Sequence, residues 1–279
     1  MRHHWQLPLA LGLMLALSHC SQLPPPAKQS PAPASISSLL LPQLNHDLGI
    51  SVTLDSTELP LAPWDLDFQP VDPMDPALPA YLRMLHQELR KYPPELLALS
   101  GVQHILLVRD LSIAGQPRLA VPDYVRDVLI YDIAHFDMAF NRHVVHHEFY
   151  HQLEARLYGT PFYRDPLWLP LKPDGFRYGK GGAYARASSH AAFSHPMQGF
   201  INRYAMSGLE EDKAELWTLL WADASWQQTY PLLQQDALLR EKLQLLVYQI
   251  SCQEPAVLPR LQHRLSALGI DAMACPQKE

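Results

Sequence analysis

The segment from Met138 to Tyr158 constrains the fold of this chain most, because its pattern is helical and it carries two histidines that a helix brings together. Gly159 follows where a helix would end, since glycine readily adopts the left-handed conformation of a helix cap. His147 and His151 are the outer residues of an H-E-x-x-H sequence. At about 100° per residue, they lie one turn apart and about 40° apart around the axis, so both imidazoles can reach one metal ion. We therefore expect a metal site on this helix.

Glu148, the second residue of the motif, falls within the same arc of the helix. It is close enough to contact a water at the metal, but too misaligned to be an equivalent ligand, which makes it the candidate catalytic base. His143 and His146 stand beside the motif, and the sequence assigns them no role. A separate apolar stripe of the helix can pack on the core, and its members are Val145, Phe149 and Leu153.

A catalytic zinc site needs a third protein ligand and leaves a fourth position to water. The spacing H-E-x-x-H-x-x-G-x-x-H would supply a third histidine, but Glu154 and Leu157 occupy the corresponding positions. Glu154 itself is one candidate, although three ligands on one helix would line up along its axis. The better candidate is Glu211, about sixty residues downstream.

The sequence around Glu211 predicts a second helix. Ser207 followed by Glu210 is typical of a capping box, and a helix beginning there places Glu211 and Glu215 on one face. A glutamate ligand followed four residues later by an acid that hydrogen-bonds a ligand histidine is the gluzincin arrangement. The outer acid, here Glu215, would orient the imidazole and raise its basicity.

At these residues the chain resembles the gluzincin metallopeptidases, and specifically the peptidase domain of anthrax lethal factor and related bacterial proteins. In that family a tyrosine precedes the ligand glutamate by seven residues, and the glutamate begins E-x-x-A-E. Tyr204 precedes Glu211 by seven residues, and Glu211-Asp-Lys-Ala-Glu215 matches the second pattern. The resemblance implies peptide-bond hydrolysis with one zinc ion bound by His147, His151 and Glu211. It also implies Glu148 as the base and Tyr204 as the residue that stabilises the oxyanion.

We expect an α+β fold, a zincin-like metallopeptidase domain with a small mixed sheet, the H-E-x-x-H helix and a helical C-terminal part. The resemblance covers residues 140–226, and residues 160–200 would be an irregular insertion of the kind that often forms a binding loop or lid. The strand at 128–133 is the candidate cleft edge that could pair with an extended peptide. Periodicity predicts the remaining elements. Strands are expected near 50–54 and 104–108. Helical segments are expected at 77–99, with a break at Pro93-Pro94, and at 208–226, 231–251 and 256–267.

The N-terminal residues resemble a bacterial export signal. Residues 1–20 have a short basic end and an apolar run, Leu7 to Leu17, that is too short to span a bilayer. Leu-Ser-His-Cys20 resembles a lipobox and predicts lipidation of Cys20, whereas the alternative is a cleaved soluble signal. Residues 21–45 predict a Pro-rich tether and 46–279 the metallopeptidase domain. We expect a protein on the periplasmic side of a bacterial membrane, lipid-anchored in the outer membrane.

Cysteine usage is consistent with export. Only Cys20, Cys252 and Cys275 occur, so lipidation of Cys20 would leave one pair. A Cys252–Cys275 disulfide is the simplest hypothesis, and two ordinary buried thiols are the alternative.

Charge and composition restrict the partners. The net charge is −6 and the basic residues are scattered, which argues against a nucleic-acid partner. The expected partner is a peptide or protein substrate, with membrane contact only through the N-terminal lipid. A non-catalytic zinc-binding envelope lipoprotein, acting as a recognition or cell-wall-binding module, is the alternative function. A third possibility is an enzyme kept latent by the loop that carries Phe176, Tyr178 and Tyr184 folding over the metal.

Overall fold

Strand β6 (Val128–Asp132) lies inside the sheet and is buried along its whole length. It pairs with β3 (His104–Ile113) in parallel and with β5 (Ala120–Asp123) in antiparallel orientation. The parallel part continues with β1 (Ser51–Thr53) on the other side of β3. Two further strands pair antiparallel with β3, namely β2 (Leu66–Pro70) and β4 (Gln116–Pro117). Among the described residues the sheet is therefore mixed and has six strands.

The prediction that residues 128–133 form an edge of the sheet is wrong. Strand β5 covers the outer side of β6, with Pro122 opposite Leu129, so β5 forms this edge. Proline has no backbone N–H to donate and is tolerated on edge strands. With only four residues and a proline, β5 has too little alternation to be recognised from its sequence.

The structure is a computed structural model that describes residues 36–57, 59, 61, 65–184, 193–271 and 275. The predicted signal segment 1–20 with Cys20, and the tether as far as residue 35, lie outside the described residues. All described residues belong to one unit, Ala34–Glu279.

The two faces of the sheet bury different sets of residues, because successive side chains of a strand point in opposite directions. One face contributes Ile105, Leu107, Leu129 and Tyr131 to the main core, which the helices complete. The other face forms a second, smaller cluster with the segment that leads into β2, and its strand members are Leu106, Val108, Leu111, Val121, Val128 and Ile130. This double coverage explains why β6 is apolar at consecutive positions.

Helix α1 (Ile36–Leu48) corrects the predicted tether, which was expected to extend to residue 45. Its leucines pack on α2 (Leu78–Leu89), with Leu44 and Leu48 buried, so the tether prediction fails where apolar residues return. The predicted break at Pro93-Pro94 is confirmed, because Pro94 begins α3 (Pro94–Ser100) and Pro93 stands at its N-cap. Proline is favoured at the first helical position, because an N–H there would have no hydrogen-bond acceptor within the helix.

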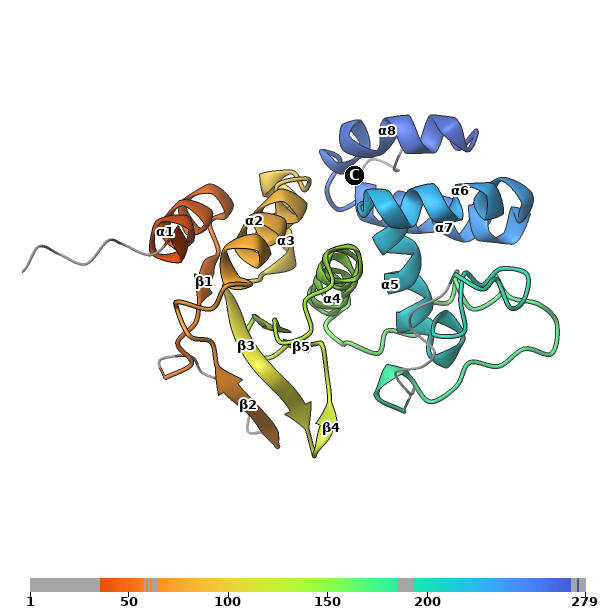
Figure 1. The fold of residues 1–279 in the computed structure, drawn as a ribbon. Helices are drawn as coiled ribbons and strands as arrows, with labels where there is room; N and C mark the ends of the chain where they lie inside the picture. The colour runs from red at the N-terminus through yellow and green to blue at the C-terminus, as the bar shows by residue number, and fades with distance from the viewer. Residues whose placement is uncertain are drawn as a thin grey trace, which may run out of the picture. The chain divides into compact units, whose positions relative to one another are not determined.

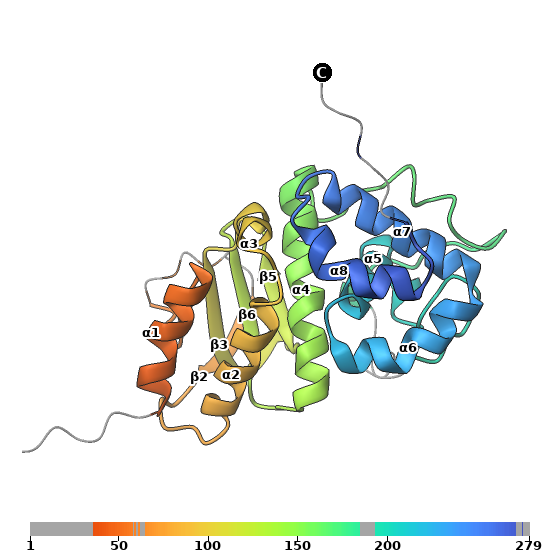
Figure 2. The same cartoon turned by 90° about the horizontal axis from the view of Figure 1, so that it is seen from above.

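Helix α4 (Met138–Tyr158) has the predicted bounds. The Asp137 carboxylate caps its first turn by accepting a 2.8 Å hydrogen bond from the Phe140 amide, and Gly159 ends it with a φ of 71°. In Figure 2 this green helix lies between the sheet with α1–α3 on one side and the blue C-terminal helices on the other. Both of its long sides are therefore covered, which buries the two histidines of the motif.

The C-terminal part is helical as predicted, but it is divided differently. Residues 208–226 and 231–251 were predicted as two helices, whereas three helices are present, because the chain breaks after Leu219 and at Asp236. Asp236 caps the later helix by accepting hydrogen bonds from Leu238 and Leu239, and Pro231 lies inside a helix instead of starting one. The helices of this part are α5 (Leu209–Leu219), α6 (Asp223–Gln235), α7 (Ala237–Ser251) and α8 (Val257–Ala267) (Figure 1).

The predicted disulfide is present: Cys252, directly after α7, is bonded to Cys275, 23 residues further on. It closes a loop around α8 near the end of the chain. Among the described residues, none of the helices has both the length and the apolar character to cross a bilayer.

We predict that a Cys252→Ser, Cys275→Ser double variant loses about 3 kcal/mol of unfolding free energy, because a cross-link over a loop of this length restricts the unfolded chain. Urea unfolding with and without a thiol reductant measures this. Reductant should lower the stability of the wild type to that of the variant and leave the variant unchanged. An equal stability of wild type and variant in the absence of reductant would contradict the expected contribution.

Candidate metal centre

The three predicted ligands converge between α4 and α5, which pack side by side. His147 Nε2 lies 3.0 Å and His151 Nε2 lies 3.2 Å from Glu211 Oε2. The two Nε2 atoms are 3.0 Å apart. Each of these side chains is less than a tenth exposed. Two nitrogens and one oxygen thus face a common point inside the protein.

The geometry and the donor types fit a bound metal ion. A tetrahedral ion with ligand distances near 2.0–2.1 Å places its ligand atoms about 3.3 Å apart, close to the observed separations. Two imidazole nitrogens that face each other at 3.0 Å can share only one hydrogen between them, so at least one presents a lone pair. His147, His151 and Glu211 are therefore buried groups that could bind a metal ion.

Glu154, the alternative third ligand, is not part of this group. Its carboxylate accepts a hydrogen bond of 2.7 Å from Lys213 Nζ and one of 3.3 Å from the Tyr150 hydroxyl. The helix directs this carboxylate to a buried ion pair, so Glu211 from the second helix supplies the third donor.

Glu215 lies one turn after Glu211 on α5 and faces the other nitrogen of the first ligand histidine. Its Oε1 is 3.0 Å from His147 Nδ1, so the acid predicted to orient this imidazole lies in ion-pair contact with it. The structure also brings two residues to this carboxylate that the sequence left without a role, His143 at 3.0 Å and Asn202 at 2.6 Å. The spacing of His143 one turn before His147 was visible in the sequence, but no sequence signal identified Asn202.

The metal-free centre is a cluster of opposite charges. Burial lowers the pKa of His147, but the carboxylates of Glu211 and Glu215 outweigh burial and hold this pKa well above the usual histidine value. The pKa of His151 is also raised, because contact with Glu211 outweighs burial. Burial alone would raise the pKa of Glu211 and Glu215, yet the adjacent histidines hold both below the usual glutamate value. A metal ion must displace these protons, so affinity should rise with pH.

Glu148 is only half-buried, unlike the ligands beside it. Burial raises its pKa, the nearby Glu211 carboxylate raises it further, and His147 and His151 oppose the change. A carboxylate whose pKa is raised towards neutrality is a more effective proton acceptor at physiological pH. This environment suits the role of a general base.

Tyr204 lies beside the ligands with its side chain buried, and its ring centroid is 5.6 Å from that of His147. Burial, together with the carboxylates of Glu211 and Glu148, raises the pKa of its hydroxyl well above the usual tyrosine value. The hydroxyl therefore stays protonated, and its hydrogen bond with Glu211 places it directly beside a candidate ligand.

The capping box predicted at the start of α5 is wrong. Gly208 is the N-cap, and the Ser207 hydroxyl donates to the Tyr204 carbonyl at 2.7 Å. Ser207 ends a short 3-10 helix (Ala205–Ser207) that directly precedes α5, so its hydroxyl bonds within that helix and does not cap α5. This turn brings Tyr204 back towards Glu211, which accounts for their spacing along the chain.

The glycine segment Gly179–Gly182 forms a wall of the centre. Its backbone N–H groups at Gly179 and Gly181 donate to the carbonyls of Met206 and Ser207 at 3.1 and 2.7 Å. A Cβ at Gly182 would overlap the side chains of Glu211 and Tyr204, so only glycine can approach them this closely. The sequence showed this glycine-rich run but gave no sign of what it contacts.

Buried ion pairs attach the 160–200 insertion to the helices behind the centre. Lys213 Nζ contacts Glu154 at 2.7 Å and Asp165, within the insertion, at 3.0 Å. On the other side of α5, Lys242 contacts Asp212 at 2.7 Å. The described part of the insertion is therefore fixed by contacts that its sequence did not indicate, although it is irregular as predicted.

Asp212, the residue after the ligand Glu211, also receives hydrogen bonds from the insertion. The Tyr178 hydroxyl donates at 2.6 Å and the Trp168 indole at 3.0 Å. These bonds fix the first turn of α5 and the insertion to one another.

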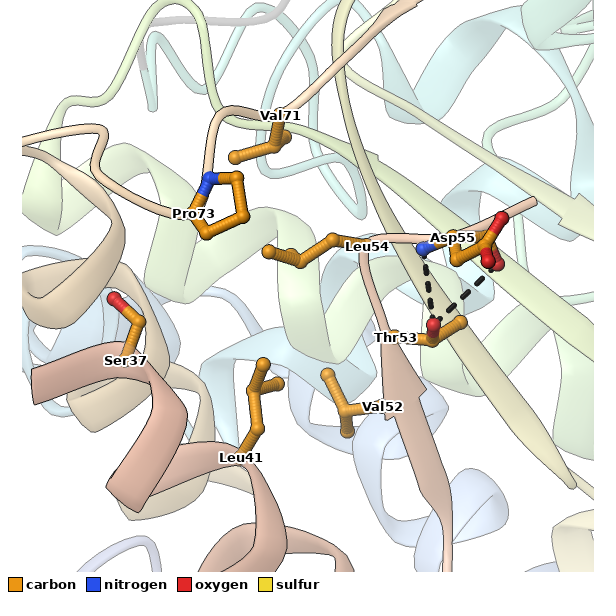
Figure 3. Close-up of a pocket in the computed structure, with 8 residues that line it drawn as sticks. All are labelled: Ser37, Leu41, Val52, Thr53, Leu54, Asp55, Val71 and Pro73. Carbon is orange, nitrogen blue, oxygen red and sulfur yellow. Dashed lines mark hydrogen bonds between the residues drawn. The ribbon is translucent and has the colours of Figure 1, made fainter. Parts of the chain in front are cut away.

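A separate cavity of about 400 Å³ lies between α1, β1 and the segment that precedes α2 (Figure 3). Apolar side chains line most of it, and the Thr53 hydroxyl is engaged with the backbone of Asp55. No residue of the metal centre lines this cavity. It contributes nothing to the chemistry of the centre.

Comparisons of this chain with protein-family models, with curated proteins and with solved structures find no match. The function proposed for this chain therefore depends on the residues of the candidate centre and their geometry.

We predict that Lys213→Met lowers the free energy of unfolding by about 3–5 kcal/mol, because Glu154 and Asp165 would be left buried without a cationic partner. Urea unfolding of the metal-free protein measures the loss. Lys180→Met, which changes an exposed lysine of the same insertion, is the matched control and should stay within about 0.5 kcal/mol of the wild type. Equal effects of the two substitutions would show that the buried pairs do not stabilise this region.

The ionisable groups of the metal-free centre should lower the free energy of unfolding both as the pH falls and as it rises. The lowered pKa values of Glu211 and Glu215 contribute stability above their unfolded value of about 4.3, and this is lost as pH falls. The raised pKa values of His147 and His151 contribute stability below about 6.5, and this is lost as pH rises through the folded values. We therefore expect maximal stability of the chelator-treated protein between about pH 4.3 and 6.5. Unfolding midpoints against pH measure it, and a midpoint that keeps rising to pH 8 would contradict the proposed ion pairs.

Proposed function

We propose that this protein is a zinc metallopeptidase of gluzincin type, with the zincin-like arrangement of a motif helix beside a mixed sheet. The observation that carries the proposal is the convergence of His147, His151 and Glu211 from two helices, with Glu148 and Tyr204 beside them. Metal binding needs neither Glu148 nor Tyr204, whereas hydrolysis needs a base and an oxyanion donor.

Zinc is the metal that this donor set suits best, because two imidazoles and one carboxylate form the ligand set of known zinc peptidases and leave one position open. When bound, it would polarise a substrate carbonyl and make a water molecule more acidic. One ion per chain is expected at the centre.

Glu148 would perform the proton transfers. Its carboxylate, half-buried and with a raised pKa, accepts a proton from the attacking water and passes it to the leaving amine. Because it is more exposed than the ligands, it can face a substrate while they face the ion.

Tyr204 would stabilise the negative charge that develops on the carbonyl oxygen. The raised pKa keeps its hydroxyl protonated, so it can donate a hydrogen bond to the tetrahedral oxyanion. Donors in this role contribute about 3–4 kcal/mol where they have been removed in other enzymes.

Strand β5 is the sheet edge that a peptide substrate would use. It packs beside α4 and forms the outer antiparallel strand of the sheet, the position we first gave to residues 128–133. An extended peptide could add to this edge through backbone hydrogen bonds. The short length of β5 would limit this pairing to a few residues around the cleaved bond.

The proposed location remains the periplasmic side of a bacterial membrane, with lipidation at Cys20. The Cys252–Cys275 disulfide supports an oxidising compartment, since such bonds are rare in reducing cytosol. The export signal and the lipid anchor are proposals from the sequence.

A non-catalytic zinc-binding module is the second candidate. The observation that favours it is the burial of all three ligands and the close approach of Gly182 to Glu211 and Tyr204. In such a module the metal would serve stability or recognition, and Glu148 would have no chemical role.

We expect Glu148→Gln to lower peptide cleavage by about 10²–10⁴-fold, because the amide cannot accept the water proton, with zinc content unchanged. The measurement compares the purified zinc-loaded wild type and variant on a mixed peptide library, with zinc quantified by mass spectrometry. Glu210→Gln is the matched control, since Glu210 is also half-buried and acidic but lies outside the proposed machinery.

Equal cleavage by the wild type and Glu148→Gln would contradict the catalytic assignment. Bound zinc without cleavage by any form would favour the binding module. A loss confined to Glu148→Gln supports the peptidase.

A further inference from the structure

Three side chains from two parts of the chain, helix α4 and the segment before α5, contact the Glu215 carboxylate. His143 Nε2 lies 3.0 Å from Oε1, Asn202 Nδ2 lies 2.6 Å from Oε2, and His147 Nδ1 lies 3.0 Å from Oε1. Each of these four residues is buried. A carboxylate so held has little freedom to rotate, because each of its oxygens already has a donor.

The donors can be satisfied in only one direction along this chain of groups. Asn202 Nδ2 is a donor, and its Oδ1 accepts from the Ala205 amide at 2.8 Å. The other nitrogen of His143, Nδ1, lies 3.2 Å from the Ser225 hydroxyl. An ionised Glu215 can only accept, so His143 has its proton on Nε2, and the Ser225 hydroxyl can donate to Nδ1 of the neutral ring.

The same logic fixes the proton of the ligand histidine. Glu215 Oε1 lies 3.0 Å from His147 Nδ1 and can only accept, so this contact favours a proton on Nδ1. When a metal ion displaces the proton from Nε2, that nitrogen presents its lone pair to the point that His151 and Glu211 also face. This is the tautomer that a metal ion requires at Nε2.

We propose that His143 and Asn202 are positioning residues of the metal centre: they hold Glu215 so that it presents His147 to the ion in the binding orientation. Neither touches the ligand atoms, so neither is a catalytic residue. Ser225 on α6 completes the arrangement by fixing the His143 ring. The inference deepens the proposed zinc function and rests on it.

The surroundings of His143 support a role beyond filling space. Phe140 and Phe193 lie beside its ring, with centroids 6.4 and 5.8 Å away, and both His143 and Glu215 are buried, so their hydrogen bond is shielded from solvent. Hydrogen bonds between charged and polar groups are stronger in such a setting. By contrast, His146 on the same helix bonds to Glu88 and Tyr92, away from the metal centre.

A second reading of the same atoms is a second metal site, because His143, His147 and Glu215 also form a compact donor group. His147 would then bridge two ions through both nitrogens. Asn202 donates to Glu215 Oε2 while both histidines lie at Oε1, so its contact is compatible with either reading. Metal stoichiometry distinguishes the two readings.

Three substitutions test the proposal. Asn202→Asp keeps the acceptor for the Ala205 amide but replaces the donor to Glu215 with an oxygen. His143→Met removes the donor while keeping a similar volume, and His143→Gln restores an N–H at nearly the same reach. We expect zinc affinity to fall about 10–100-fold in Asn202→Asp and His143→Met, and to recover in His143→Gln.

Zinc affinity is measured by competition with a chromophoric chelator, and the cobalt(II) absorption spectrum reports the ligand geometry independently of activity. Unfolding curves accompany each variant. His146→Gln is the control, because it alters a buried histidine of the same helix without touching Glu215. It should leave the cobalt spectrum unchanged even if it lowers stability.

The outcomes separate this inference from the proposed function. One zinc per wild-type chain, with weakened binding and an altered cobalt spectrum in Asn202→Asp and His143→Met, supports it. One zinc bound equally by all variants overturns the positioning role and leaves the zinc function standing. Two ions per chain, with one lost in His143→Met, overturns it in favour of a second metal site. No zinc in the wild type overturns both.

Discussion

The packing of α4 against α5 is the constraint on which the candidate metal centre depends, because two of its candidate ligands lie on one helix and the third on the other. An aromatic cluster around Tyr92 sets this packing. The Tyr92 ring stacks on Phe149 of α4 with centroids 4.2 Å apart. The Trp217 indole of α5 donates to the Tyr92 hydroxyl at 3.1 Å. His146 bonds the same hydroxyl at 2.7 Å. The cluster lies on the side of α4 away from the ligands, so stacking there determines how closely Glu211 approaches the histidines.

The rotation of α5 about its axis is fixed by charges on either side of the ligand. Asp212 pairs with Lys242, and Lys213 pairs with Glu154 of α4, all of them buried. A buried charge is costly unless it has a partner, so these residues tolerate few alternative arrangements. Together they direct Glu211 into the centre, and they attach the insertion whose glycine segment closes over it.

Much of the fold could be predicted from local patterns. Helix α4, its cap at Gly159 and the break at Pro93-Pro94 depend on periodicity and on residues with restricted backbone conformations, which act within a few positions. The edge strand β5, helix α1 and the division of the C-terminal helices could not be placed as well. A four-residue strand with a proline has almost no pattern of its own, and α1 is recognisable only through the core on which its leucines pack.

The sequence by itself determined the ligands of the candidate centre, because a helix necessarily aligns His147 with His151 and the resemblance singled out Glu211, Glu215 and Tyr204. Only the tertiary structure decided what surrounds them. His147 and Glu211 are 64 positions apart, and Asn202, His143 and Gly182 reach the site through contacts between different elements. Helical periodicity fixes which side chains share a face, whereas the partner that each face meets depends on how separate helices and loops pack.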